Sequence, residues 1–411
     1  IMSHVERLPL IFDHHNHLSF SAMLSSFPYV GQYTSKKDVL SYVRDHVNSD
    51  NALTVVTGLR QEAIKLTEAD LDSLPPLVFL NNCLHGYTCS AKAADILRKE
   101  HIEPYPGTAK QAEKEMAKLF FFFSASPALC PSAEHLAPAF KQCINSWRQA
   151  GLYGAEDMMY TLPYACEAKL CGNFKVKTRR PWRESDSLEK EQNASANHAT
   201  DRICIKLFAD GALGAGTAAI SEGYVKNGHP VLIYDDDELA AILRKCITWE
   251  ADTAIHTIGD MAIAQVLRIL RSCGSKPAGC RFKLRLEHCQ FITLKQAQEC
   301  KQLGITLCMQ PNFSHDSLAY AHKLSPICCR RNNPLRMLID QVGFLPGKDL
   351  LWGSDGMPSG LAPALQSALF PPQPEQALTI EEVLSGYSAD SAFGYREYII
   401  DEEQQSVVLK Q

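Results

Sequence analysis

Residues 283–310, KLRLEHCQFITLKQAQECKQLGITLCMQ, contain the pattern that decides the fold. The apolar run KLRLEHC leads into a helix-length stretch, TLKQAQECKQLG, and a second apolar run, ITLCMQ, follows it. Thr293 is a suitable N-cap for this helix, and Gly304 is a typical stop. Short apolar runs joined by a helix are typical of βαβ units, so the stretch predicts two parallel strands and the helix between them.

The same alternation extends over most of the chain. The stretch 235–251 is typical of a helix with acids in its first turn, where the helix dipole favours them. The pattern predicts an α/β fold and is compatible with a (β/α)8 TIM-type barrel, although a doubly wound sheet has the same alternation. The expected strands are 8–15, 52–56, 76–80, 203–208, 253–257, 283–289, 305–310 and 349–355.

Two polar stretches fall outside this alternation. Residues 177–201 are charged and nearly free of aliphatic side chains, which indicates a mobile surface excursion. Glu156 and Asp157 are expected in a solvated turn. We therefore expect residues 1–390 to form the main domain with an insertion around 177–201, and residues 391–411 to form a tail with one strand, QSVVLK.

Composition excludes several classes of partner. The 41 basic and 46 acidic residues give a net charge of -5, which argues against a nucleic-acid partner. No apolar run approaches the ~20 residues of a membrane span, and we expect no secretory signal. The 15 cysteines form no CxxC pair, which favours reduced thiols and a cytoplasmic protein. We expect a small-molecule substrate, and a homodimer is left open.

The first candidate ligands lie in the segment DHHNH at 13–17. Alternate side chains of a strand share a face, so His15 and His17 project together. Two imidazoles on one inward face can chelate a metal such as zinc. An isolated HxH is more often an incidental polar loop, so the motif needs support from elsewhere in the chain.

That support comes from the ends of later strands. His256, His288 and Asp355 each follow an apolar run directly. In a barrel the carboxyl ends of the strands converge on one mouth, where catalytic groups gather. Each residue alone fits a satisfied histidine or a turn aspartate, but together they predict a metal centre. Lys206, inside the apolar run ICIKLF, is costly to bury unless it snorkels, pairs with Asp210 or loses its charge.

The order of HxH, Lys, His, His and Asp resembles the metal-binding signature of the amidohydrolase superfamily. The local sequence is similar to the third amidohydrolase family, the group of the N-substituted formamide deformylases. The resemblance extends from about residue 8 to about residue 394. The matching segments are 205–220, 254–263, 285–293, 308–317 and 351–360, with a weaker match at 70–93.

This resemblance implies a metal-dependent hydrolase with one or two divalent ions, zinc by preference. The HxH pair and Asp355 would hold the more buried ion, the two later histidines would hold the second, and Lys206, carboxylated, would bridge them. Asp355 would also shuttle the proton of the attacking water, and His288 would assist at the carbonyl. The implied metal ligands are His15, His17, Lys206, His256, His288 and Asp355.

The resemblance is less informative about the substrate. Phe313 occurs where the family more often has a polar pair, and the family's accessory β-sandwich is expected to be reduced or missing. The reaction expected is hydrolysis of an amide or formamide C–N bond. A mononuclear zinc deaminase of a heterocyclic amine and an inactive, ligand-binding barrel are the alternatives. The candidate substrate contacts are Asn82, His85, Asp210, Gln310 and Phe313.

Overall fold

The computed structural model describes residues 3–47, 52–60, 63–81, 86–126, 129, 133–159, 162, 169–182, 203–226, 228–274 and 279–410. The chain divides into two compact units, which are described separately. The first unit consists of Ile1–Leu18, Ile144–Tyr160 and Asn173–Gln411, and the second consists of Ser19–Cys143 and Thr161–Gly172.

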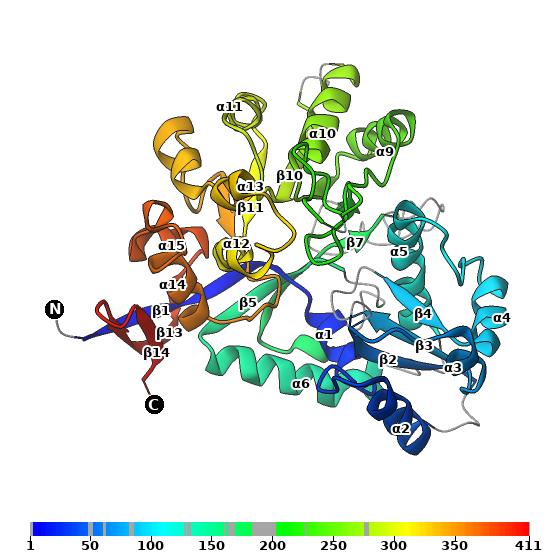
Figure 1. Ribbon diagram of the computed structural model, residues 1–411. Coiled ribbons are helices and arrows are strands. Elements are labelled where there is room, and N and C mark those ends of the chain that lie inside the picture. The colour runs from blue at the N-terminus through cyan, green and yellow to red at the C-terminus, as the bar shows by residue number, and fades with distance from the viewer. Residues whose placement is uncertain are drawn as a thin grey trace. The chain divides into compact units, whose positions relative to one another are not determined.

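The first unit contains two sheets (Figure 1). One has the strand order β12-β11-β10-β9-β8-β7, and the other has the order β14-β13-β1-β5-β6. The strands are β1 (His4–Asn16), β5 (Leu152–Asp157), β6 (Lys175–Thr178), β7 (Arg180–Pro181), β8 (Cys204–Phe208), β9 (Asp252–Thr257), β10 (Lys283–His288), β11 (Thr306–Met309), β12 (Leu350–Trp352), β13 (Asp390–Asp401) and β14 (Ser406–Leu409).

One stretch of chain takes part in both sheets. β6 pairs in parallel with β5, and β7, which begins two residues after β6 ends, pairs in parallel with β8. β1 pairs in parallel with β5, and the pairs from β7 to β12 are all parallel. The strands β1, β5, β6–β7 and β8 to β12 therefore follow one another side by side with their carboxyl ends at the same edge.

Helices connect these parallel strands, as the alternating sequence pattern predicts. α9 begins with a capping box between Asp235 and Glu238, and α11 begins with one between Thr293 and Gln296. The helices of this unit include α9 (Asp236–Thr248), α10 (Asp260–Ser272), α11 (Leu294–Gln302), α12 (Asp316–Ala319), α13 (Pro326–Arg331), α14 (Leu361–Leu369) and α15 (Ile380–Gly386), with short turns η1 (Pro311–His315), η2 (Met337–Val342) and η3 (Pro374–Gln376).

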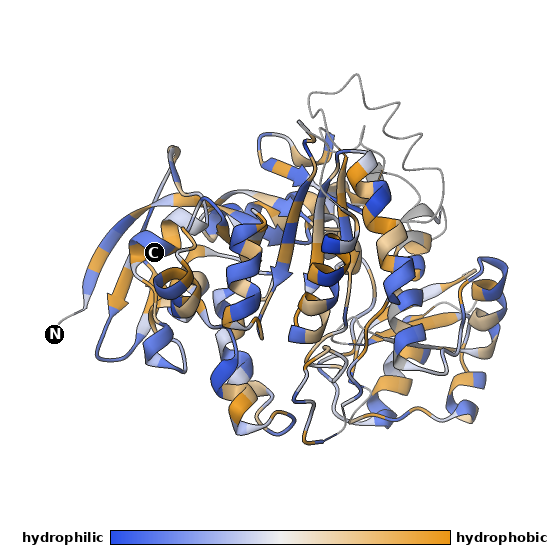
Figure 2. Cartoon of the chain, turned by 90° about the horizontal axis from the view of Figure 1, so that it is seen from above, coloured by the Kyte–Doolittle hydropathy of each residue, from blue (hydrophilic) through white to orange (hydrophobic). Residues whose placement is uncertain are grey.

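The core of this unit lies on both faces of the parallel strands. In β9 and β10 every residue after the first is buried, as expected when helices cover a parallel sheet. Figure 2 shows hydrophobic and hydrophilic residues on both the strands and the helices. The described elements thus confirm the predicted α/β class.

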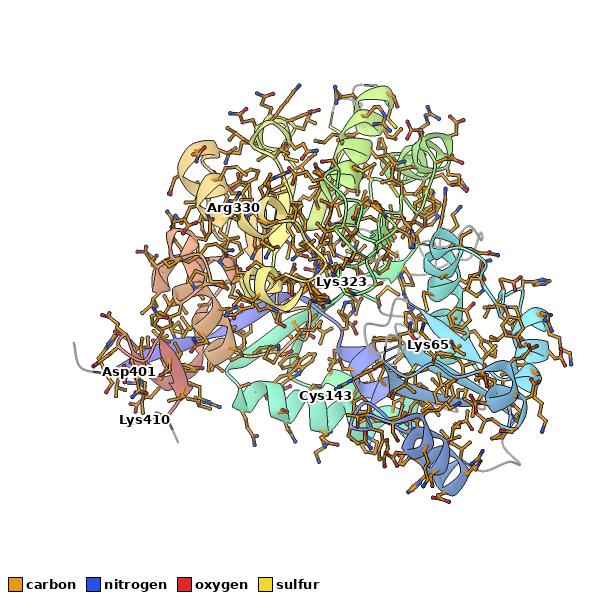
Figure 3. The ribbon with its side chains drawn as sticks, in the orientation of Figure 1. Lys65, Cys143, Lys323, Arg330, Asp401 and Lys410 are labelled. Atoms are coloured by element: carbon orange, nitrogen blue, oxygen red, sulfur yellow. The ribbon has the colours of Figure 1, made fainter. Side chains whose placement is uncertain are left out.

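A small antiparallel sheet extends the first unit beyond its parallel strands. β13 pairs with the first half of β1 and with β14. Asp401 and Lys410, labelled in Figure 3, lie on the hairpin that β13 and β14 form. The tail strand expected at QSVVLK corresponds to β14, whereas β13 is a second strand in the tail that was not expected.

The second unit has its own sheet and hydrophobic core. Its strands have the order β2-β3-β4, with β2 and β3 parallel and β3 and β4 antiparallel. Val39, Val43, Val56, Leu77 and Phe79 are part of its buried cluster. Its elements are α1 (Leu18–Leu24), which begins at the last residue of the first unit, α2 (Lys36–His46), β2 (Thr54–Leu59), α3 (Glu68–Asp72), β3 (Leu77–Asn81), β4 (Tyr87–Cys89), α4 (Ala91–Lys99), α5 (Ala109–Ala125) and α6 (Ala133–Gln149), which ends in the first unit.

The structure corrects two expectations. Glu156 and Asp157 are each 1% exposed and lie in β5, where two arginines neutralise Glu156, rather than in a solvated turn. Residues 177–182 were expected in a surface excursion, but they include the end of β6 and all of β7. Arg179 is accommodated there because it forms ion pairs with buried carboxylates. Residues 183–201 lie outside the described residues. Among the helices that the structure describes, none is both long and apolar enough to cross a membrane.

Candidate metal centre

The candidate ligands come from strand ends of the first unit. His15 lies near the end of β1, His256 lies in β9 and His288 is the last residue of β10. His17 follows β1 directly, and Asp355 follows β12 by three residues. The parallel topology places these positions at one edge, because the carboxyl ends of parallel strands meet there.

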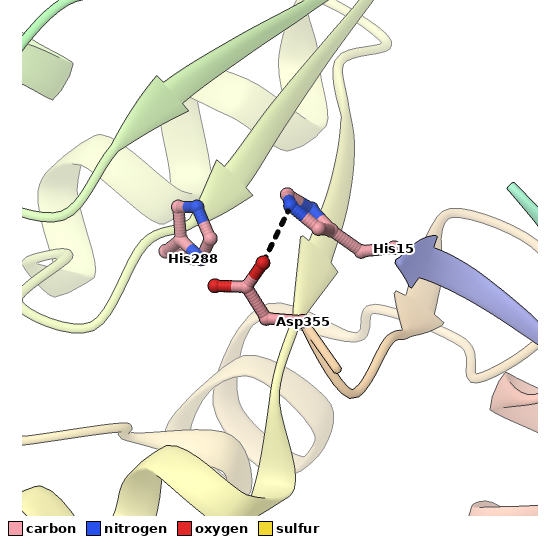
Figure 4. A group of neighbouring side chains, drawn as sticks. All are labelled: His15, His288 and Asp355. Carbon is pink, nitrogen blue, oxygen red and sulfur yellow. Dashed lines mark ion pairs between the residues drawn. The ribbon is translucent and has the colours of Figure 1, made fainter. Parts of the chain in front are cut away.

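The ligand atoms of three of these residues form a compact group. One ligand atom each from His15, His288 and Asp355 lies within 4.8 Å of the other two (Figure 4). Nε2 of His15 is 3.4 Å from Oδ1 of Asp355, and Nε2 of His17 is 2.9 Å from the same oxygen. The ring of His256 lies 4.5 Å from the ring of His288, measured between centroids. The structure thus brings together the predicted histidines and the aspartate.

Hydrogen bonds at Nδ1 hold the rings of His15 and His288 in place. Nδ1 of His15 lies 2.6 Å from Oε2 of Glu287, and Nδ1 of His288 lies 2.8 Å from Oε1 of Gln310. With Nδ1 of each ring bonded in this way, Nε2 is left as the metal-binding nitrogen. His256 differs, because its Nε2 lies 3.0 Å from the carbonyl oxygen of Gly211.

The backbone at two of these positions is strained. His288 has φ 70° and Asp355 has φ 55°, in the left-handed region that residues other than glycine rarely occupy. Such strain costs on the order of 1–3 kcal/mol and persists where surrounding contacts impose it. The backbone N of Asp355 donates to the carbonyl oxygen of His15 at 2.8 Å, and this bond joins the end of β12 to β1.

Lys206 supplies the observation that tests whether a metal fits. Its side chain is 1% exposed in β8, and among the described residues its Nζ has no hydrogen-bond partner. Burial lowers the pKa of this amine to about 8. A buried, unsatisfied amine in the same sheet as two candidate ligand histidines fits a site completed by a bound group, so the donor set suits a divalent metal.

The surroundings act differently on the two buried imidazoles of His15 and His288. Burial lowers the pKa of His15, but Glu287 and Asp355 outweigh it and raise that pKa. Burial, assisted by the neighbouring His15, lowers the pKa of His288 to about 3. Burial by itself raises the pKa of Asp355, but His15 and His17 outweigh it and hold that pKa well below its usual value. At neutral pH the site therefore offers a neutral His288 and an ionised Asp355, the protonation states that metal binding needs.

The residues predicted to contact the substrate differ from one another in their surroundings. The ring of Phe313 stacks on His288, with centroids 5.7 Å apart. Gln310 is fully buried and contacts His288. Asp210 accepts hydrogen bonds from the backbone N of Ala219, Ile258 and Gly259 at 2.8–2.9 Å. These backbone contacts explain the burial of the Asp210 carboxylate without a bound substrate. Asn82 and His85 lie outside the described residues.

Two kinds of supporting residue escaped the sequence analysis. Asp13 is buried and accepts hydrogen bonds from the backbone N and the Oγ of Ser354, at 2.9 and 2.5 Å, which ties β1 to the segment after β12. Glu287 and Arg285 are buried in β10 beside the histidine ligands. The available signal was the alternation of Arg285 and Glu287 with leucines in a predicted buried strand, an anomaly similar to that of Lys206.

The fold and the site define a class of protein: an α/β chain with a histidine and carboxylate cluster at the carboxyl ends of its parallel strands. A profile described as the amidohydrolase family matches residues 8–397. The chain belongs to the amidohydrolase family, which confirms the resemblance seen in its motifs.

Two individual proteins that resemble this chain share less than 30% sequence identity with it. The chain is 27% identical over 274 residues to the Bacillus subtilis (strain 168) protein YtcJ, whose name places it among the amidohydrolases; the match covers 60% of this chain and 50% of YtcJ. It is 28% identical over 114 residues to the Arabidopsis thaliana protein LONG AFTER FAR-RED 3, covering 27% of this chain and 20% of that one. The matches thus span half or less of these curated relatives.

Solved structures with the same fold include two described as uncharacterized metal-dependent hydrolases. The one from Pyrococcus furiosus aligns with a TM-score of 0.64 at 18% identity, covering 93% of this chain and 81% of that one. The one from Pyrococcus horikoshii OT3 aligns with a TM-score of 0.66 at 19% identity, covering 94% and 80%. At these identities the likeness establishes the fold.

Proposed function

We propose that this chain is a metal-dependent hydrolase whose metal centre lies at the mouth of a (β/α)8 barrel. The barrel is supported by the lateral order β1, β5, β6–β7 and β8 to β12, and by the bond from Asp355 N to His15 O that joins the last strand to the first. In this arrangement the sheet of β1, β13 and β14 takes the place of a reduced accessory β-sandwich.

The observation that carries the proposal is the convergence of His15, His288 and Asp355, whose ligand atoms lie within 4.8 Å of one another. The proposed ligands also include His17 and His256, with Lys206 as a carboxylated bridge. Carboxylation would convert its buried cation into an anion, which removes the repulsion that an ammonium beside dications would suffer. Imidazole and carboxylate donors suit Zn²⁺.

A divalent cation held there would acidify water and polarise a carbonyl group. The carboxylate of Asp355 would accept the proton of the attacking water and deliver it to the leaving nitrogen. His288, kept neutral by burial and held by Gln310, would contribute to carbonyl polarisation. We therefore propose a non-peptide C–N bond, of the amide or formamide type, as the bond that is cleaved.

Aromatic side chains support a substrate with an apolar portion. Phe313 stacks on His288, and the ring of Phe208 lies 5.2 Å from the ring of His256, measured between centroids. Both phenylalanines are partly exposed. These rings beside the candidate ligands would favour an apolar or planar group next to the scissile bond.

One observation favours a second candidate, a mononuclear deaminase. The ligand atoms of His15, His288 and Asp355 form one compact group, which suffices for one ion. The deaminase would use His15, His17, His256 and Asp355, with His288 as the polarising group. Metal stoichiometry separates the two, because the bridged site needs two ions per chain.

A substrate screen tests the proposed function. Protein loaded with Zn²⁺ is assayed on amides, formamides, cyclic amides and aminoheterocycles, with chelated protein as the control. Turnover of an amide or formamide that disappears on chelation is expected. Turnover confined to aminoheterocycles would favour the deaminase, and turnover that survives complete metal removal would refute both.

A further inference from the structure

A row of alternating charges in the first unit begins at the candidate metal ligand His15. Nδ1 of His15 donates to Oε2 of Glu287 at 2.6 Å. The other oxygen of Glu287 accepts a hydrogen bond from Nε of Arg285 at 2.5 Å, and Nη1 of Arg285 donates to Oε2 of Glu156 at 2.7 Å. None of these side chains is more than 5% exposed.

The row continues to Asp252, the first residue of β9. Nε of Arg179 donates to the remaining oxygen of Glu156, and Nη2 of Arg179 donates to Oδ1 of Asp252 at 2.9 Å. Nζ of Lys177 lies 3.2 Å from both Glu156 and Asp252. Asp252 begins β9, whereas His256 lies near its end. We call the series His15, Glu287, Arg285, Glu156, Arg179, Asp252 and Lys177 the charge row.

Stability alone is a poor explanation for such a row. Removing a charge from water costs several kcal/mol, and buried ion pairs often stabilise a fold no better than apolar residues of the same volume. What an ion pair does supply is a fixed geometry. Arg285 Nη2 also donates to the carbonyl oxygen of His14 at 3.1 Å, so the row holds both the imidazole of His15 and the backbone beside it.

We propose that Glu287 is a positioning residue for His15, and that Arg285 and Glu156 hold Glu287 in place. With its Nδ1 proton donated to Glu287, the imidazole keeps its lone pair on Nε2, the atom that lies 3.4 Å from Asp355. The negative charge of Glu287 also increases the donor strength of that nitrogen. This inference rests on the proposed function, because it takes His15 as a metal ligand.

Glu287→Gln tests the proposal, since it keeps the shape of the side chain and removes its charge. The dissociation constant for Zn²⁺ is measured on the full chain by competition with a chelator. Loss of an outer partner of a metal-binding histidine weakens binding about 10–100-fold, which is the effect expected here. The matched control is Glu382→Gln in α15, where Glu382 binds Arg336 at 2.8 and 2.9 Å; its Zn²⁺ affinity is expected to equal that of the wild type.

Glu156→Gln separates positioning from mere stability. Both Glu156 and Glu287 are 1% exposed or less, so both variants are expected to lower the free energy of unfolding. Only Glu287 contacts a proposed ligand, so Glu156→Gln is expected to lose less Zn²⁺ affinity than Glu287→Gln. An equal or greater loss in Glu156→Gln would overturn the proposal, as would wild-type affinity in a folded Glu287→Gln.

A second variant covers the case in which Glu287→Gln does not fold. Glu287→Asp keeps the charge next to Arg285 but is one methylene too short to reach His15, and the same loss of Zn²⁺ affinity is expected. Unchanged affinity in Glu287→Asp would overturn the positioning role. A wild-type chain that fails to bind Zn²⁺ would instead refute the proposed function, so the two failures are distinct.

Discussion

Gly353→Ala is expected to disrupt the junction between β12 and β1 and, with it, the metal centre. A Cβ at position 353 would lie 2.3 Å from Cβ of His15, 2.6 Å from its backbone N and 2.8 Å from its Cα. Carbon atoms pack at about 3.5–4.0 Å, so the two segments would have to separate by about 1.2 Å. The clash involves backbone atoms of a proposed ligand, which no side-chain rotation can relieve.

Two effects follow from a shift of that size. Overpacking a buried site typically costs about 1–3 kcal/mol of stability, and a misplacement of about 1 Å at a catalytic site can lower activity by about 10²-fold. We expect a lower urea midpoint for the metal-free chain and weaker Zn²⁺ binding, measured by denaturation and by chelator competition.

Gly107→Ala is the matched control for this substitution. A Cβ there would meet one atom, Oε1 of Gln111, at the ordinary contact distance of 4.0 Å. Its stability and Zn²⁺ affinity are expected to match the wild type. Gly353→Ala with wild-type stability and Zn²⁺ affinity would refute the close junction between β12 and His15.

Three further perturbations test the chemistry and the charges. Asp355→Asn is expected to lower kcat by about 10²–10⁴-fold with a smaller effect on folding, and near-normal turnover would place the proton transfer on another group. Lys206→Ala is expected to lose the second metal and most activity, with partial rescue by a short-chain carboxylic acid; full activity with one metal would favour the mononuclear alternative. Burial raises the pKa of Glu156, but Arg179 and Arg285 outweigh it and hold that pKa far below its ordinary 4.5. The ionised form of Glu156 therefore stabilises the fold above about pH 4.5, and this contribution to stability falls at lower pH. Denaturation of wild type and Glu156→Gln from pH 7 to pH 3 is therefore expected to show a stability difference that shrinks as the pH falls, and a constant difference would contradict the assignment.

The strand-end ligands were predictable because their signal is local. Buried parallel strands are largely apolar, so a histidine near the end of one, such as His256, is conspicuous in the sequence. The helix cap at Thr293 and the acidic first turn of the helix in 235–251 were predictable for the same reason, since each depends on residues within one turn. The α/β class followed from the alternation of such elements.

The supporting contacts were not predictable, because they depend on residues distant in the chain. Glu156 looked like a turn residue, and its partner Arg285 lies 129 residues away. β5 and β6 were missed, because glycine, lysine and acidic residues interrupt their apolar pattern. The expected strands at 52–56 and 76–80 exist as β2 and β3, but they belong to the sheet of the second unit. The apolar pattern of a strand does not indicate which of two sheets the strand joins.

Elemental analysis of the wild type and of a His15→Ala, His17→Ala double variant tests the central claim most directly. We expect one or two divalent ions per wild-type chain, and in the double variant loss of the ion that the HxH pair holds, while the circular dichroism of the fold is retained. His4→Ala, on the exposed beginning of the same strand, is the control and is expected to keep its full metal content. A folded double variant that retains full metal content would contradict the account.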